Sequence, residues 1–527
     1  MSKIPKEIGG VTFHNPSAFW FGIVASAAGV LLHFPMYLAA ADMHYHMAGM
    51  SMDFSMKAGM ILIIVGLVAG LYGLYPGRLQ NAGAACDIRI GALDEVKLNK
   101  AHVLMLVAMA LAVTIDVMKP TTLAFVLPGM AKEYGLKSPL VPTGTIPAAL
   151  LPLSGITGTV LGSFIWGWLG DRIGRRASIL FAGILFIDTS ICGAMPDFWL
   201  NLLMCFLMGL GVGGMLPIAY TLVAETVPAR HRGVLMVLIG GDIAAAYIAT
   251  SWLSAVLIPL YSWRVLWLLG LPTGLLLILL NRWIPESPRF LVASGHVEAA
   301  RAVMRRFGAK ITNAPPVQEK ASGRPRSILP QALIVALLGI SAGLVVFGFD
   351  LWIPSNLRKL GLTEVGTDKV LRNSASIGFP LTFVVAWLYG YWNSKKTLIG
   401  LSVITTTALI CLAVVGDAAV NNRALLYALL VIPIWGINTL TACIAAYASE
   451  VFPQAMRARG SGLAAGASKA GGVLIILLVL LSVAAPSIAA TAAIGAVPMA
   501  VAALLFCRVG RETQKRPLEQ IAVGEYT

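Results

Sequence analysis

The sequence predicts an all-α polytopic membrane protein with fourteen membrane helices. Of its 527 residues, 58% are hydrophobic and 12% are charged, whereas a soluble globular domain has roughly 25% charged residues. A membrane helix needs about 20 predominantly apolar residues. Apolar runs of suitable length lie near residues 18–41, 57–76, 102–128, 145–169, 177–195, 198–225, 234–259, 264–282, 328–353, 372–391, 397–416, 424–448, 461–484 and 487–507.

The placement of basic residues predicts the orientation of the chain in the membrane. A net charge of +15 would suggest a nucleic-acid partner for a soluble protein, but here the distribution of the charge decides. Most Lys and Arg residues, such as Lys97, Arg175 and Arg282, fall in loops on one side, and the other side holds few, such as Lys132. The positive-inside rule therefore places both termini in the cytoplasm. We expect a bacterial inner (plasma) membrane, with the first apolar run retained as an anchor.

A polar, charged segment between the eighth and ninth runs divides the chain into parts. We expect an N-terminal two-helix extension with a Met/His-rich external loop and a cytoplasmic linker at 1–100, an N-terminal six-helix half at 101–285, a cytoplasmic linker at 286–327 that is partly helical, a C-terminal six-helix half at 328–508 and a cytoplasmic tail at 509–527.

Two motifs recur between the expected halves. Glu225 and Arg232 in ETVPARHRG recur as Glu450 and Arg457 in EVFPQAMRARG, 225 residues later. The stretch GWLGDRIGRR, which begins at Gly167, has a weaker counterpart in GYWNSKK at nearly the same offset. Repeated motifs at one offset indicate duplicated six-helix halves.

The GWLGDRIGRR stretch joins two apolar runs by a tight turn. Its glycines permit the turn, and we expect its charges to stay at the water interface. The stretch resembles the loop between the second and third helices of the major facilitator superfamily. PESPRFL, the Trp263–Arg264 pair and the tail ETQKRPLEQI resemble the sugar-porter and organic-ion branch, which includes metabolite:proton symporters. The resemblance covers residues from about 100 to 521.

The resemblance implies a secondary transporter that works by alternating access, with cytoplasmic motifs that lock one state. The gate residues implied are Gly167, Asp171, Arg172, Gly174, Arg175, Arg176, Glu225, Arg232, Glu286, Arg289, Glu450 and Arg457. The alternative is that these charges serve only to orient the chain. The chain departs from the family pattern at Asn393, where an acid is expected, so we predict a weaker lock in the second half. The site-forming helices also offer few neutral hydrogen-bonding groups, which argues against a sugar substrate.

Ionised side chains inside the expected membrane helices are candidates for substrate binding and proton coupling, because each costs roughly 2.5–3.5 kcal/mol to insert. These residues are Asp116, Lys119, Asp242, Asp350 and Lys469. Asp116 and Lys119 lie on one helix face, in a segment that loosely resembles the Asp-Gly-aromatic-Asp element of metabolite:proton symporters. A basic residue there favours an anionic substrate, and a desolvated carboxylate can exchange a proton. The alternatives are a structural Asp116–Lys119 ion pair and a snorkelling Lys469.

The loop between the first two apolar runs is rich in soft metal ligands. Its candidate ligands are Met43, His44, His46, Met47, Met50 and Met52. Thioethers and imidazoles together suit copper. The alternative is a flexible loop whose methionines pack on lipid or on neighbouring helices.

The leading hypothesis is therefore a proton-coupled symporter of a small organic anion such as a carboxylate. The alternatives are a transporter of a metal, copper-like, or of a metal complex that enters at the N-terminal loop, and a non-transporting membrane sensor of the same fold. We expect no enzyme activity and no cofactor. The glycines of GLGVGGMLP follow no strand, so they favour close helix packing over dinucleotide binding.

Overall fold

The computed structural model describes residues 6–8, 11–75, 90–137, 143–309, 328–349, 364–416, 422–481 and 487–516, with single residues 357, 418, 518 and 521. The chain forms two compact units. The first contains Met1–Thr226 and Asp242–Val317, and the second contains Val227–Gly241 and Gln318–Thr527. A short antiparallel pair, β1 (Lys6–Ile8) with β2 (Val11–Phe13), precedes the helices and was not expected from the sequence.

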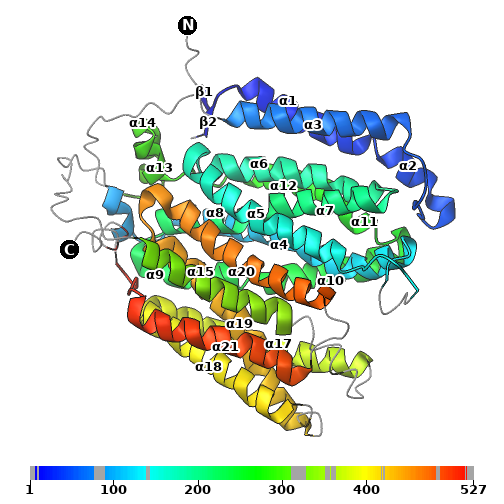
Figure 1. Ribbon diagram of the computed structural model, residues 1–527. Coiled ribbons are helices and arrows are strands. Elements are labelled where there is room, and N and C mark those ends of the chain that lie inside the picture. The colour runs from blue at the N-terminus through cyan, green and yellow to red at the C-terminus, as the bar shows by residue number, and fades with distance from the viewer. Residues whose placement is uncertain are drawn as a thin grey trace. The chain divides into compact units, whose positions relative to one another are not determined.

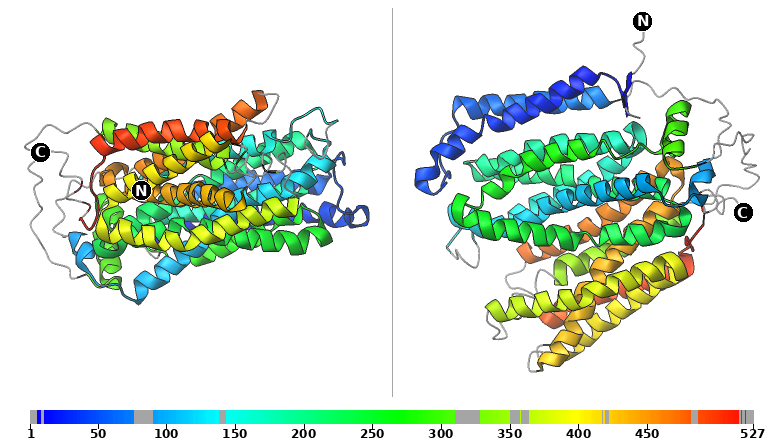
Figure 2. Two further views of the ribbon diagram at one scale, coloured as in Figure 1. Left: turned by 90° about the horizontal axis from the view of Figure 1, so that it is seen from below. Right: turned by 180° about the vertical axis from the view of Figure 1, so that it is seen from behind.

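The N-terminal extension is a helical hairpin held together by glycines. Helices α1 (Pro16–Leu31) and α3 (Phe54–Leu74) lie side by side (Figures 1 and 2). A Cβ at Gly22 would lie 2.7 Å from the carbonyl oxygen of Gly66, and one at Gly29 would lie 2.7 Å from that of Gly59. Because lipid provides no hydrophobic drive for two membrane helices to associate, such close backbone packing is what stabilises the pair.

The hairpin packs against other helices of the first unit, to which it belongs. A Cβ at Gly70 of α3 would lie 2.7 Å from the Ile184 side chain of α6 (Arg175–Asp188). The Tyr37 hydroxyl of the short helix α2 (Phe34–Ala39) donates to the carbonyl oxygen of Tyr261, 2.8 Å away. The two helices that lie outside the predicted repeat are therefore attached to the six-helix half that follows them.

The helices of the first unit match the predicted apolar runs closely. After the turns η1 (Ala41–Met43) and η2 (Ile90–Glu95), they are α4 (Lys100–Glu133), α5 (Leu150–Ile173), α6, η3 (Thr189–Ala194), α7 (Phe198–Val212), α8 (Met215–Thr226), α10 (Ile243–Tyr261), α11 (Val265–Leu268), α12 (Gly270–Leu280), α13 (Pro288–Ala293) and α14 (Val297–Arg306). The last of these lies where the linker was expected to be helical.

The second unit begins with one helix from the middle of the chain. Its elements are α9 (Ala229–Gly240), α15 (Leu329–Leu344), η4 (Val345–Phe349), α17 (Glu364–Trp387), η5 (Leu388–Trp392), α18 (Ser394–Val415), α19 (Arg423–Val451), η7 (Gln454–Met456), α20 (Arg457–Leu481) and α21 (Ile488–Val509). The run 234–259 is therefore two helices, which part at Gly241 and Asp242 and belong to different units.

Eleven helices of the described residues are long and apolar enough to cross a membrane. A bent pair, Trp252–Tyr261 with Val265–Leu280, raises the number to as many as twelve. By this measure the predicted fourteen spans are not all found. The second part of the run 234–259 and the run 264–282 count together as this one bent pair, and α17 is not among the spans found.

Candidate functional site

Six charged side chains gather around the α5–α6 turn of the first unit. They are Asp94, Asp171, Arg175, Glu225, Glu286 and Arg289, here called the Arg175 cluster. The guanidinium of Arg175 lies 3.3 Å from Asp171 Oδ1 and 3.1 Å from Glu225 Oε1, and it donates to the carbonyl oxygen of Gly170 at 3.0 Å. The side chains of Arg175 and Asp171 are 2% and 5% exposed, so these two charges of the turn contact protein rather than water. Two carboxylates and a carbonyl replace the hydration of Arg175.

Arg289 joins this cluster to segments far away in the sequence. Its guanidinium lies 3.0 Å from Asp94 Oδ2 and donates to the carbonyl oxygen of Glu225 at 2.9 Å. Asp94 lies in η2, ahead of the helices, and Arg289 lies in α13 after them. The cluster therefore ties both ends of the first six-helix half to the end of α8.

Glu286 caps the N-terminus of α6. Its carboxylate accepts from the backbone N–H of Arg175 at 2.8 Å, of Arg176 at 3.0 Å and of Ser287 at 2.9 Å. A carboxylate is favourable there because the helix N-terminus carries a partial positive charge. Burial nevertheless raises the pKa of Glu286 to about 7, against the opposing effects of these backbone hydrogen bonds and of Arg175. Gly174 makes the turn possible, since its φ is +99° and a Cβ would overlap the carboxylate.

The remaining gate candidates of this loop have separate contacts. Gly167 is buried within α5. The guanidinium of Arg172 lies over the Trp168 ring, 4.4 Å from its centroid. Arg176 Nε donates to Asn281 Oδ1 at 3.0 Å, which links α6 to the end of α12.

The second unit has a similar cap built from the C-terminal tail. The Glu512 carboxylate accepts from the backbone N–H of Ser394 at 3.0 Å and of Lys395 at 3.2 Å, as Glu286 does at the start of α6. Asn393, which replaces the expected acid, caps the same helix by accepting from Lys396 N at 2.7 Å. The repeat thus extends to how each half caps its third helix.

The repeated Glu and Arg residues occupy distinct surroundings. Glu225 belongs to the Arg175 cluster. Arg232, Glu450 and Arg457 are all buried in the second unit, where Arg232 acts electrostatically on Glu450. One oxygen of Glu450 accepts from the Tyr389 hydroxyl at 3.1 Å and the Thr513 hydroxyl at 2.7 Å.

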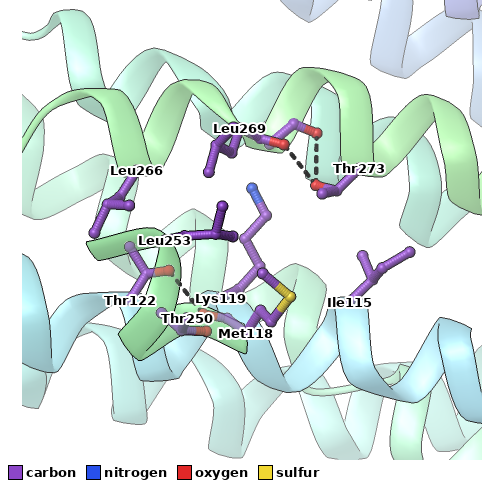
Figure 3. Close-up of a pocket in the computed structure, with 10 residues that line it drawn as sticks. Ile115, Met118, Lys119, Thr122, Thr250, Leu253, Leu266, Leu269 and Thr273 are labelled. Atoms are coloured by element: carbon purple, nitrogen blue, oxygen red, sulfur yellow. Dashed lines mark hydrogen bonds between the residues drawn. The ribbon is translucent and has the colours of Figure 1, made fainter. Parts of the chain in front are cut away.

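A second candidate site surrounds the Lys119 side chain within the first unit. A pocket, here called the Lys119 pocket, is lined by Ile115, Met118, Lys119, Thr122, Thr250, Leu253, Leu266, Leu269, Gly270 and Thr273. In Figure 3 the Lys119 side chain leaves α4 and extends toward the helix that carries Leu269 and Thr273. Lys119 is the one charged residue of this lining, and it is 5% exposed.

The Lys119 ammonium has a single carbonyl as its hydrogen-bond acceptor among the described residues. Nζ donates to the carbonyl oxygen of Phe186 at 3.4 Å, which also accepts from the Ser190 hydroxyl at 3.3 Å. The alternative of an Asp116–Lys119 pair is not found among the ion pairs of the described residues, because Nζ turns to Phe186 instead. The hydroxyls of Thr122 and Thr273 donate to carbonyls of their own helices. Lys119 is therefore the strong donor that this lining offers to an anion.

The other coupling candidates lie at different depths of the fold. Asp116 is buried on α4, one turn before Lys119. Asp242 lies at the start of α10, where its carboxylate accepts from the Thr114 hydroxyl of α4 at 2.6 Å. Lys469 is half-buried on α20 of the second unit. Asp350 lies outside the described residues.

The Met/His-rich loop contacts the end of α4 through its backbone. The N–H groups of Met47 and Ala48 donate to Glu133 Oε1 at 2.8 and 3.1 Å, and Arg264 lies 2.6 Å from the same oxygen. Met47 is fully buried, whereas the His46 side chain is 59% exposed and lies 3.9 Å from Glu133.

The structure gives no support to a metal site in this loop. The described residues contain no group of three or more His, Cys, Asp and Glu side chains that could hold a metal ion. Of the other candidate ligands, Met43 is 48% exposed and His44 has a left-handed backbone, with φ of +53°. Met47 is fully buried, which agrees with the alternative that the methionines of this loop pack on neighbouring helices.

Three carboxylates of these sites were not identified from the sequence. Asp94 lies outside the apolar runs in the expected linker, and Glu512 opens the tail motif ETQKRPLEQI but was not named as a site residue. Glu133 was not singled out, although Arg264 of the Trp263–Arg264 motif signals it, because a buried guanidinium requires an acid partner.

The chain matches the family model described as Major Facilitator Superfamily over residues 104–475. This chain belongs to the major facilitator superfamily. This match confirms the resemblance that the sequence motifs indicated. The chain is a transmembrane secondary transporter, and its family consists of transporters, not enzymes.

Curated relatives include bacterial metabolite transporters. The niacin transporter NiaP of Acinetobacter baylyi is 24% identical over 82% of this chain and 99% of its own length. The inner membrane metabolite transport protein YgcS of Escherichia coli is 28% identical over 62% of this chain and 74% of its own length. The chain is therefore similar to the metabolite:proton symporter-like branch.

Solved structures confirm the fold. The proton:xylose symporter XylE matches with a TM-score of 0.66 and 18% identity over 80% of this chain and 98% of that chain. A partially occluded, inward-open form of the xylose transporter XylE from E. coli matches with a TM-score of 0.56 and 17% identity over 78% of this chain and 98% of that chain.

Proposed function

We propose that this protein couples the symport of a small organic anion, most simply a carboxylate, to protons by alternating access. The observation that carries this proposal is the buried Lys119 ammonium. A buried cation is costly unless an opposite charge or several hydrogen bonds replace its hydration. A substrate carboxylate would supply both to Lys119, so binding and charge neutralisation would coincide.

The composition of the Lys119 pocket supports a carboxylate rather than a sugar. Five of its side chains are apolar, and the hydroxyls of Thr122, Thr250 and Thr273 donate to their own helices. A sugar needs several neutral partners, whereas a carboxylate needs one strong cation. Niacin, named for two relatives, is a carboxylic acid and gives a practical probe, nicotinate.

The acids near Lys119 are our candidates for the proton-coupling step. Asp116 lies one turn away on α4, and Asp242 is connected to α4 through Thr114. Lys469 and Asp350 are retained as candidates from the second half. Replacement Asp116→Asn keeps the shape of the side chain but removes its titration. We expect it to preserve exchange of preloaded substrate and to abolish accumulation driven by a proton gradient.

The Arg175 cluster and the Arg232–Glu450 region are proposed to act as cytoplasmic gates. The buried carboxylates of the cluster favour a gating role, because the positive-inside rule needs only the basic residues to orient the chain. Asp171→Asn should shift the population toward inward-open states at unchanged expression. Disulfide crosslinking across each side of the protein measures that ratio, and an unchanged ratio would leave the loop a purely topological role.

We also propose that the predicted topology and division of the chain hold in the membrane. In this proposal fourteen helices span a bacterial inner membrane with both termini in the cytoplasm, and the parts are 1–100, 101–285, 286–327, 328–508 and 509–527. An impermeant thiol reagent should label Met43→Cys from outside intact cells. Glu298→Cys should be labelled only after permeabilisation, and the reverse pattern would overturn the orientation.

Transport itself is tested with purified protein in proteoliposomes. Radiolabelled nicotinate, benzoate, lactate, xylose and copper are offered with and without an inward proton gradient. We expect uphill uptake of at least one carboxylate, which an uncoupler abolishes. Uptake of xylose or copper with no carboxylate transported would contradict the proposal.

A further inference from the structure

A glycine faces the charged end of Lys119. A Cβ at Gly270, the first residue of α12, would overlap both Lys119 Nζ and Ser190 Oγ and would lie 2.9 Å from the carbonyl oxygen of Phe186. These three atoms lie together around the charged end of Lys119, since Nζ and Ser190 Oγ both donate to Phe186 O. The space that a methyl group would fill at Gly270 is therefore the space in which the ammonium lies.

We propose that Gly270 is a positioning residue that determines where the Lys119 ammonium lies, and through it the affinity for the substrate anion. The link to affinity rests on the proposed function. The link between Gly270 and Lys119 does not, because it can be measured with no anion present. Alanine at 270 is attached to a helix backbone, whereas Lys119 has a flexible four-carbon stem. The ammonium, rather than the helix, would move away from Phe186.

Helix packing alone accounts for the next glycine of α12 but not for this one. A Cβ at Gly274 would lie 2.8 Å from the carbonyl oxygen of Gly183 and 2.8 Å from Ile187 Cγ1, both on α6. Gly274 therefore packs α12 against α6 through backbone and apolar atoms. Gly270 faces the same helix but contacts Nζ, a hydroxyl and a carbonyl. Gly274→Ala is thus a matched control on the same two helices.

The first experiment is a double-mutant cycle on thermal unfolding in detergent, without substrate. Methionine at 119 is one atom shorter than lysine and carries no charge. Gly270→Ala should therefore lower the unfolding temperature clearly in the parent protein and by at most half as much in the Lys119→Met background. Gly274→Ala should cost the same in both backgrounds. Equal costs of Gly270→Ala in both backgrounds would overturn the positioning role.

The second experiment measures binding of nicotinate and of its neutral amide, nicotinamide. Loss of one charge-assisted hydrogen bond should weaken nicotinate binding at least about tenfold in Gly270→Ala, with little change for nicotinamide. Gly274→Ala should change the affinities for nicotinate and nicotinamide by the same factor. Equal weakening of both ligands by Gly270→Ala would contradict the inference.

The two experiments separate this inference from the proposed function. Suppose that Gly270→Ala costs less in the Lys119→Met background, but the protein binds no carboxylate of the panel. That result would support the positioning of Lys119 by Gly270 and overturn the anion proposal. Suppose instead that nicotinate binding depends on Lys119, but Gly270→Ala costs the same in both backgrounds. That result would support the anion proposal and overturn the role of Gly270.

Discussion

Replacement of Glu286 by glutamine should remove a specific pH dependence of stability. The buried carboxyl has a pKa of about 7, against 4.5 for an ordinary glutamate. A raised pKa of an acid means that the folded protein holds the proton more tightly than the unfolded chain. Its contribution to stability is therefore complete below pH 4.5 and is lost as the pH rises through 7. At 1.36 kcal/mol per pKa unit, the difference amounts to at most about 3 kcal/mol.

The assay is chemical unfolding of the detergent-solubilised protein from pH 4.5 to 8.5. As the pH rises from 4.5 to 8.5, the parent should lose up to about 3 kcal/mol of unfolding free energy relative to the Glu286→Gln variant, because glutamine does not titrate. The variant still loses one acceptor for the N–H groups of Arg175 and Arg176, so it should be less stable than the parent at low pH. Glu298→Gln, at an exposed position of α14, should leave the profile unchanged. If the difference in unfolding free energy between the parent and Glu286→Gln does not change with pH across this range, the reasoning is refuted.

Three further substitutions test other parts of the structure. Gly66→Val should separate α3 from α1, because a Cβ at 66 would overlap the Ser26 hydroxyl, and hydrogen exchange of α1 should rise; Gly400→Ala, with no atom within 4 Å of the added carbon, should change nothing. Glu133→Leu leaves the Arg264 guanidinium buried without its acid and should lower the free energy of unfolding by about 3–5 kcal/mol, and an unchanged stability would show that the ion pair is dispensable. Glu512→Ala removes one of the two caps of α18 and leaves that of Asn393, which should cost about 1 kcal/mol and raise proteolysis of the tail, whereas unaltered proteolysis would argue against the Glu512 cap.

Much of the architecture was predictable because membrane helices carry a strong signal. Apolar runs located α3, α5 and α18 within a few residues. Breaks inside a run were harder to see. Asp242 begins a new helix within the run 234–259, and hydropathy averages over such a position.

The residues of the Arg175 cluster were predictable only where a motif marks them. Arg175 and Glu286 belong to short motifs that recur in the family. Asp94 has no such motif, and its partner Arg289 lies in another segment. Pairing across a long sequence separation depends on how the helices pack, which local patterns do not encode.

The Met/His-rich loop shows another limit of sequence reasoning. Soft side chains drew attention to metal chemistry, yet the loop contacts Glu133 through the backbone N–H groups of Met47 and Ala48. Every residue type except proline has such a donor. A contact of this kind therefore leaves no signature in residue type.

The most direct test of the account compares an organic anion with its neutral amide in the parent protein and in a Lys119→Gln variant. Each transported carboxylate of the panel is offered to proteoliposomes beside its amide, with Lys132→Gln as the control, because Lys132 is exposed on the same helix. We expect the parent and the control to take up the carboxylate in strong preference to the amide, and Lys119→Gln to lose that preference. A preference for the carboxylate that survives in Lys119→Gln would contradict the assignment of Lys119 as the anion-binding residue.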